Sequence, residues 1–232
     1  MATAGRPSEV EHTKERLVSK IYSAYNLAVA ILDLPSQVNP NAPAGLHPSH
    51  KRQVVELAFM GMVAAWEEFL ELVLVRYVAG AATASGYRPT PKYGLANSIQ
   101  HSYELVSQDS RYDQFKDYLK VTDPKWVTQR ADFFFSAHPF GVLTTKTDLI
   151  KHATSIRNRI AHESDKCKSD FKDTAIHFLQ PTNNTLTQGY GPGKLLLEPV
   201  QRHFGQSVVQ RKLDHFDAYT ELFEQLANDI VP

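Results

Sequence analysis

The sequence has one cysteine, no excess of either charge and no long hydrophobic run, and each shortage narrows what the chain can do. Cys167 has no second cysteine with which to form an internal disulfide, which suits a reducing compartment. Twenty-five basic and 25 acidic residues cancel, whereas proteins that bind the nucleic-acid backbone carry an excess of Lys and Arg. The balance argues against a dedicated high-affinity DNA-binding protein and leaves room for a local basic site.

Hydrophobic runs are too short for a membrane span. In the most hydrophobic region, the longest run without charge extends from Leu57 to Trp66 and is flanked by Glu56 and Glu67. A membrane-spanning helix needs about 20 predominantly apolar residues. The first residues also lack the apolar core of a signal peptide. We therefore expect a cytoplasmic protein with no membrane association.

What is present is a strong helical periodicity. Hydrophobic residues make up 42% of 232 residues, enough for a sizeable core. The pattern predicts an all-α bundle in a single domain spanning 1–232, with a Pro-rich loop over 34–49. The aromatic segment 131–147 is expected to form a packed loop over the bundle. The expected helices are 8–32, 51–79, 95–106, 111–121, 147–161, 165–179 and 211–229.

A turn-rich insertion over 181–208 interrupts this pattern. Turn residues flank β-prone runs, which predicts a short β-hairpin or an ordered loop near 184–200. The string "GYGPGK" within it differs from a phosphate-binding loop. Such a loop needs glycine at position 188 and Ser or Thr at position 195, and the chain has Gln188 and Leu195.

The string "RNRIAH", residues 157–162, ends the helix predicted over 147–161. On a helical wheel Arg157 lies beside the apolar stripe of that helix, where its guanidinium is partly desolvated and needs an anionic partner. His162 lies five residues further on, about 140° away if the helix continued. Both side chains can face one ligand only if the helix ends near Ala161, and Ser164 and Asp165 are suitable caps for a new helix.

The pair Arg157 and His162 contains the parts for metal-free RNA cleavage. Arginine offers a permanently charged fork that matches a phosphate, and histidine exchanges a proton near neutral pH. Two copies at a dimer interface would supply more of the groups that the reaction needs. The other interpretation is a structural arginine followed by a histidine at a helix end, where its charge favours the helix dipole.

The ten histidines also raise the question of a metal site. His47 with His50, and His162 with Cys167, lack the convergent ligand sets of zinc sites. We therefore expect surface histidines, no metal and no cofactor. His152 points away from Arg157 on the wheel and is not assigned to the site.

The string "SIRNRIAHES" resembles the signature of the HEPN superfamily, and "MVAAWEEFLELVLVRY" resembles the second helix of some HEPN groups. HEPN proteins are α-helical domains in which an arginine, four to six intervening residues and a histidine form a ribonuclease site. The similarity is greatest to RiboL-PSP-like and related stand-alone HEPN proteins of prokaryotic conflict systems.

The resemblance implies that Arg157, Asn158 and His162 are catalytic, together with an acidic residue of the second helix. That residue is Glu67 or Glu68. The wheel places Glu67 in an apolar row and Glu68 beside Glu71 on a solvated face, so we predict Glu67, paired with Arg157. The same ion pair would also be expected in a purely structural role.

The expected function is that of a homodimeric, metal-independent endoribonuclease that leaves a 2′,3′-cyclic phosphate, acting as a toxin or an anti-phage defence effector. Its partners would be an RNA substrate, a second copy and an antitoxin or defence-system protein. One alternative is a non-catalytic HEPN domain that binds RNA or nucleotide or mediates assembly. Another is a plain helical interaction protein.

Overall fold

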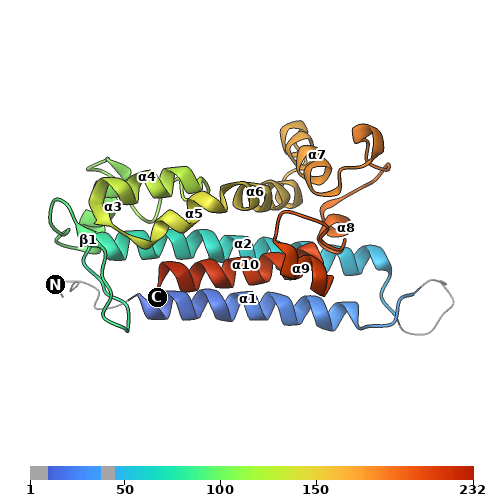
Figure 1. The fold of residues 1–232 in the computed structure, drawn as a ribbon. Helices are drawn as coiled ribbons and strands as arrows, with labels where there is room; N and C mark the ends of the chain where they lie inside the picture. Colours follow the sequence, from blue (N-terminus) through green and yellow to red (C-terminus); the bar gives the residue numbers. More distant parts are fainter. Residues whose placement is uncertain (1–9, 38–44) are drawn as a thin grey trace. The chain divides into compact units, whose positions relative to one another are not determined.

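The structure, a computed structural model, describes residues 10–37 and 45–232. Ten α-helices make up most of the described chain, and its one sheet has two short strands (Figure 1). The predicted all-α class is therefore confirmed. The expected start of the first helix at Ser8 and residues 38–44 of the expected loop lie outside the described residues.

The elements follow one another along the chain as labelled in Figure 1. The α-helices are α1 (Glu11–Leu32), α2 (Pro48–Val78), α3 (Ile99–Ser107), α4 (Pro124–Phe134), α5 (Val142–Thr145), α6 (Thr147–Ala161), α7 (Asp165–Leu179), α8 (Pro192–Leu196), α9 (Gln206–Arg211) and α10 (His215–Ile230). The strands are β1 (Thr90–Pro91) and β2 (Phe135–Ala137), which pair antiparallel. The 3₁₀-helices are η1 (Pro139–Gly141) and η2 (Thr182–Asn184).

The chain divides into two compact units. Unit 1 comprises the residues up to Val18 together with Ala65–Thr147 and Glu224–Pro232, and unit 2 comprises Ser19–Ala64 and Asp148–Phe223. The boundaries fall inside α1, α2 and α10 and after the first residue of α6, so each of these helices contributes residues to both units. The single domain over 1–232 stays a prediction.

Helix α2 supplies core residues to each unit. In unit 2 the ring of Phe59 packs edge-on against Tyr219, with 5.3 Å between the ring centroids. In unit 1 the ring of Tyr77 packs edge-on against Phe140 at 6.1 Å. A helix that is apolar on most of its faces is expected to be buried on most of them. The fully buried residues of α2 include Val55, Phe59, Met62, Leu70, Val73, Leu74, Val75 and Tyr77.

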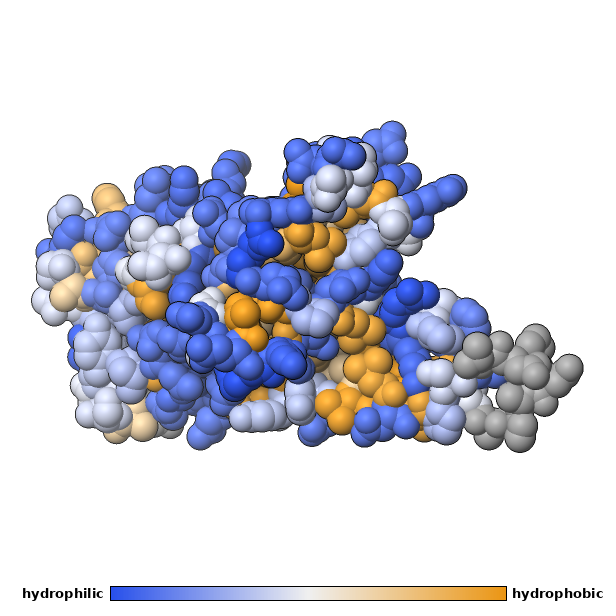
Figure 2. All heavy atoms as spheres, turned by 45° about the vertical axis from the view of Figure 1, so that its right-hand side comes forward, coloured by the Kyte–Doolittle hydropathy of each residue, from blue (hydrophilic) through white to orange (hydrophobic). Residues whose placement is uncertain are grey.

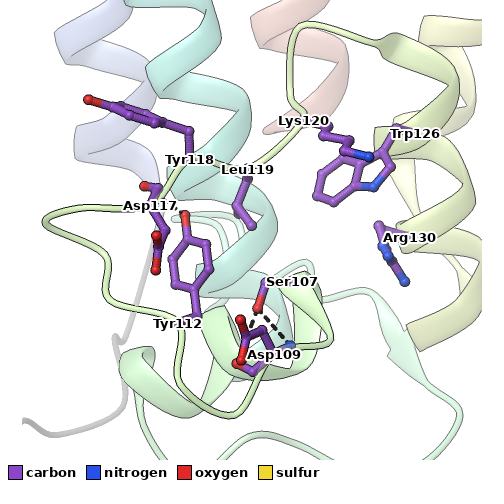
Figure 3. A pocket seen from close by; sticks show the side chains of 9 residues that line it. All are labelled: Ser107, Asp109, Tyr112, Asp117, Tyr118, Leu119, Lys120, Trp126 and Arg130. Atoms are coloured by element: carbon purple, nitrogen blue, oxygen red, sulfur yellow. Dashed lines mark hydrogen bonds between the residues drawn. The ribbon is translucent and has the colours of Figure 1, made fainter.

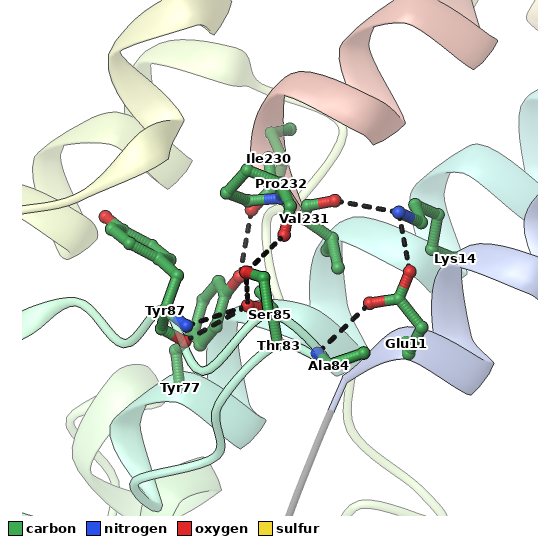
Figure 4. A network of polar contacts seen from close by, with 10 residues as sticks. All are labelled: Glu11, Lys14, Tyr77, Thr83, Ala84, Ser85, Tyr87, Ile230, Val231 and Pro232. Carbon is green, nitrogen blue, oxygen red and sulfur yellow. Dashed lines mark hydrogen bonds and ion pairs between the residues drawn. The ribbon is translucent and has the colours of Figure 1, made fainter.

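The C-terminal residues are held in unit 1 by a polar network (Figure 4). The hydroxyl of Tyr77 donates to the carbonyl of Ile230 at 2.9 Å, and this bond is buried. Lys14 Nζ donates to the carbonyl of Val231 at 2.9 Å, and Ser85 Oγ donates to the carbonyl of Pro232 at 3.2 Å. The first donor satisfies a carbonyl group that the end of α10 leaves without an intrahelical partner, and the other two fix the residues that follow the helix.

In unit 2 a buried lysine connects the end of α1 to the start of α2. Lys51 is only 7% exposed, and its Nζ donates to the carbonyls of Leu32, at 2.9 Å, and Leu34. A cation at a helix C-terminus is favoured by the helix dipole and by the free carbonyls there. The interaction offsets the cost of burying the ammonium group.

The helix expected over 111–121 does not form, and that prediction is wrong. Asp113 Oδ1 accepts the backbone N–H of Phe115 at 2.9 Å, and Asp117 Oδ2 accepts that of Asp113 at 2.8 Å. Such local side-chain bonds give the backbone an alternative to the helical ladder. The segment is therefore a series of turns.

Helix α4 was not expected, although its start carries a sequence signal. Asp123 is the N-cap and accepts the N–H of Lys125 at 3.1 Å, and Pro124 occupies the first turn. Proline is favoured there because its missing N–H would have no helical partner. The aromatic segment 131–147, expected to be a packed loop, contains the end of α4 followed by β2, η1 and α5.

Of the two alternatives for 184–200, the ordered loop holds. The segment contains α8 and an isolated bridge from Pro199 to Asp214, and among the described residues the paired strands lie elsewhere, at β1 and β2. Pro192 starts α8 in residues that were expected to be extended. The last helix begins at His215 rather than near Arg211, because Lys212 adopts a left-handed conformation that ends α9 (φ 56°).

Within the described part of the chain, no helix combines the length and the apolar character that crossing a membrane requires. The face drawn in Figure 2 is largely hydrophilic, with apolar side chains reaching the surface in separate places. Single exposed apolar residues are normal for a folded domain.

Tyr77→Phe should lower the free energy of unfolding by about 1–3 kcal/mol, because the carbonyl of Ile230 would be left buried without its donor. Urea unfolding followed by circular dichroism measures the change. The matched control is Tyr93→Phe, at a side chain that is 75% exposed, which should change stability by less than about 0.5 kcal/mol. Equal stability of Tyr77→Phe and wild type would contradict the role given to this bond.

Candidate functional site

Helix α6 carries the predicted motif and has the predicted bounds, Thr147–Ala161. Leu149, Ala153 and Ile156 of the expected apolar stripe are buried, whereas Ile160 is only partly buried. The N–H of His162 makes the last helical hydrogen bond, to the carbonyl of Asn158 at 2.9 Å, and residues 162–164 are not helical. Ser164 then caps α7 by accepting the N–H of Cys167 at 3.3 Å.

Arg157 and His162 lie in different environments at this helix end. Arg157 is half-buried and its Nε atom is inaccessible to solvent. His162 is exposed, one residue beyond α6, and Asn158 is half-buried. A half-buried cation five residues before an exposed imidazole is a combination of groups that can bind a phosphate at the surface.

A neighbouring ion pair holds the segment after the motif. Arg159 donates from Nη1 to the carboxylate of Glu163 at 3.0 Å and to the carbonyl of His162 at 3.3 Å. The pKa of Glu163 is lowered by this hydrogen bond and charge. The side chain of Arg159 therefore connects the backbone at His162 to helix α6.

The acidic residues of α2 differ in exposure. Glu67 is half-buried, whereas Glu68 is exposed and forms an ion pair with Arg16. Glu67 belongs to unit 1 and Arg157 to unit 2, and their pairing stays a prediction. The expectation that Glu71 lies on a solvated face is wrong. Glu71 is half-buried, its carboxylate accepts a hydrogen bond from the hydroxyl of Tyr103 at 2.9 Å, and burial raises its pKa.

A stack of imidazole rings in unit 2 was missed. His177 stacks on His152, with 4.4 Å between centroids, and on His203 at 4.1 Å. His152 Nδ1 lies 3.0 Å from the hydroxyl of Thr174. A fourth histidine, His215, is 1% exposed and contacts the ring of Phe178, which also contacts the stack. These residues were expected to be surface histidines and come from four separate segments, which no local spacing reveals.

The stack holds its rings face to face instead of converging their nitrogens. Among the described residues, no group of three or more His, Cys, Asp or Glu side chains is placed to hold a metal ion. Burial and the neighbouring imidazole of His177 lower the pKa of His152 to about 4, and burial also lowers the pKa values of His177 and His215. Burial therefore favours the neutral forms of His152, His177 and His215.

A second feature of unit 2 is an open pocket of about 310 Å³ at the glycine-rich loop, with Arg52 and Lys194 among its lining residues. Glu56, on the same side, accepts the N–H of Gly193 at 2.7 Å. A Cβ on residue 193 would lie 2.7 Å from the carbonyl oxygen of Arg52, so glycine is required for this close approach. The loop therefore packs on α2, and it brings two cations together.

Comparison of the chain with protein-family models, with curated proteins and with solved structures gives no match.

Lowering the pH from 7.5 to 5 should destabilise the protein through the histidine stack. The folded pKa of His152, about 4, lies below its unfolded value of about 6.5. Between these two values the unfolded chain binds more protons, so stability falls as pH falls. Asp148 opposes the effect and Arg202 adds to it. Urea unfolding at each pH measures the loss.

His177→Phe keeps a ring in the stack and removes a titrating group, so its loss between pH 7.5 and 5 should be smaller than that of wild type. Asp214, whose pKa burial raises to about 6, stabilises the fold as pH falls, and comparing the two proteins cancels this contribution. His162→Ala, at an exposed histidine, should show the wild-type loss. An identical pH dependence in His177→Phe would show that the stack does not couple to stability.

Proposed function

We propose that the protein is a HEPN-like, metal-independent endoribonuclease whose catalytic residues are Arg157, Asn158 and His162, with Glu67 as a positioning residue. The observation that carries the proposal is the end of α6 at Ala161. It leaves His162 exposed immediately beyond the helix, while Arg157 stays half-buried within it. The resemblance of "RNRIAH" to the HEPN motif adds the class of reaction.

The reaction uses the 2′-hydroxyl of the RNA as its nucleophile. His162 accepts or delivers a proton, because the pKa of an imidazole lies near neutral pH. Arg157 stabilises the negative charge that builds on the phosphorus-bound oxygens as the 2′-oxygen attacks and the 5′-oxygen leaves. The products are a 2′,3′-cyclic phosphate on one fragment and a 5′-hydroxyl on the other.

Asn158 and Glu67 act beside these two groups. Asn158 has an amide that donates to a phosphate oxygen or accepts from a ribose hydroxyl. Glu67 is half-buried on α2, and a carboxylate paired with Arg157 would hold the guanidinium in one orientation. In the same unit as the motif, Arg52 and Lys194 add cations that suit the backbone of an RNA strand.

One copy of the motif provides one cation and one imidazole, which is few for a reaction that needs a base, an acid and charge stabilisation. A twofold dimer with both motifs at its interface would supply two of each. We therefore expect a homodimer at micromolar concentration in multi-angle light scattering. A strict monomer that retains cleavage activity would contradict this expectation.

Purified protein should cleave single-stranded RNA in excess EDTA and leave 2′,3′-cyclic phosphate ends, which mass spectrometry identifies. An RNA with a single 2′-deoxy sugar at the cut site should resist, because it lacks the internal nucleophile. Activity that disappears in EDTA and returns with Mg²⁺, or cleavage of the 2′-deoxy substrate, would overturn the mechanism.

His162→Ala and Arg157→Ala should each lower the cleavage rate by about 100-fold or more, since proton transfer and charge stabilisation typically contribute on that order. The matched control is His47→Ala, another exposed histidine, which should cleave at the wild-type rate. An unchanged melting curve for His162→Ala separates lost chemistry from lost folding.

A ribonuclease of this kind would act in cells as a toxin or defence effector, controlled by an antitoxin or other partner protein.

A further inference from the structure

A pocket of about 320 Å³ lies in unit 1, between the turns that follow α3 and the side chains of α4 (Figure 3). Three aromatic rings line it, those of Tyr112, Tyr118 and Trp126, together with the cations Lys120 and Arg130. The volume falls at the small end of the range for ligand sites, which suits one nucleotide or base.

Of the three rings that line the pocket, Tyr112 is buried and Trp126 is half-buried, whereas Tyr118 and the nearby Phe115 are unusually exposed. Tyr118 is 91% exposed, and Phe115, three residues earlier, is 87% exposed. Burying a large apolar side chain typically adds about 1.5–3 kcal/mol to the free energy of unfolding. Two rings that stay in solvent do not make this contribution. Exposed aromatics grouped with charged residues mark interaction surfaces.

The cations stand close to these rings. The guanidinium of Arg130 lies 5.3 Å from the ring centroid of Trp126, and its Nη2 donates to Gln108 at 3.1 Å. In Figure 3 the side chain of Lys120 lies beside Trp126. The pocket therefore places two cations beside one indole ring.

The acidic residues of the pocket accept hydrogen bonds from the backbone of the turns. Asp109 Oδ1 accepts the N–H of Arg111 at 2.9 Å, and Asp117 Oδ2 accepts that of Asp113 at 2.8 Å. The hydroxyl of Tyr112 also holds these turns, because it donates to the carbonyl of Asp117 at 3.1 Å. Burial and the neighbouring carboxylates raise the pKa of Tyr112 to about 12, so the hydroxyl keeps this donated proton near neutral pH.

We infer that this pocket binds single-stranded RNA, with one base against the ring of Trp126, a neighbouring base against that of Tyr118, and the phosphate between them near Lys120 and Arg130. Aromatic rings interleaved with cations are the usual means of holding a single strand, because every base has a face that stacks. A base within a duplex is already stacked and cannot enter. The inference rests on the proposed action on RNA and adds a binding subsite to it.

The test uses the full-length His162→Ala protein, so that RNA is bound without being consumed. The chain has two tryptophans, of which Trp66 is 1% exposed, so a base that enters the pocket should quench the fluorescence of Trp126. Titration with an eight-nucleotide single-stranded RNA should give saturable quenching, and a duplex of the same sequence should give none. Anisotropy of a labelled RNA provides the dissociation constant independently.

Tyr118→Ala in this background should raise the dissociation constant about tenfold or more, as expected for the loss of one stacked base. Tyr118 is 91% exposed, so folding should be unaffected. Tyr93→Ala, at a ring that is 75% exposed and lies outside the residues lining the pocket, is the matched control and should bind as the parent does. Absence of quenching, equal quenching by the duplex, or unchanged affinity in Tyr118→Ala would each overturn the inference.

The two proposals fail separately in this design. If wild type does not cleave RNA but the quenching and the Tyr118→Ala effect are found, the pocket stands and the ribonuclease proposal falls. If wild type cleaves RNA and single strands do not quench Trp126, the pocket assignment falls and the catalytic one stands.

Discussion

The burial of α2 is the constraint on which the rest of the structure depends. This 31-residue helix has buried residues along most of its length and contributes to both compact units. Its C-terminal end is fixed in unit 1, where Tyr77 bonds to the carbonyl of Ile230 at 2.9 Å. Its N-terminal end is fixed in unit 2, where Lys51 bonds to the end of α1. Two carboxylates of this largely apolar helix, Glu67 and Glu71, are half-buried, and buried carboxylates need partners.

The candidate site depends on a second, local constraint, the end of α6. If the helix continued, Arg157 and His162 would point about 140° apart. The helix ends at Ala161 and Ser164 caps the next one, so His162 is the first residue beyond the helix, although its N–H still bonds to Asn158. The proposed joint action of the two groups on one phosphate depends on this local termination and capping.

Sequence reasoning succeeded where local rules decide the structure. The bounds of α6 and α7 follow from apolar periodicity and from the cap at Ser164. The helix predicted over 111–121 was wrong, because side chains such as Asp113 accept backbone N–H groups and stabilise turns there instead. The imidazole stack and the half-burial of Glu71 could not be predicted, because both arise from contacts between segments distant in the sequence. The roles of Arg157 and His162 stay predictions, since burial and helix bounds describe their placement and not their chemistry.

Expression in bacteria tests the catalytic assignment most directly. Wild type and His162→Ala would be induced to equal levels, and growth and the integrity of total RNA would be followed over the same period. The account predicts growth arrest with fragmented RNA for wild type, and normal growth with intact RNA for His162→Ala. Equal growth and equal RNA integrity in the two cultures, with both proteins folded, would contradict it.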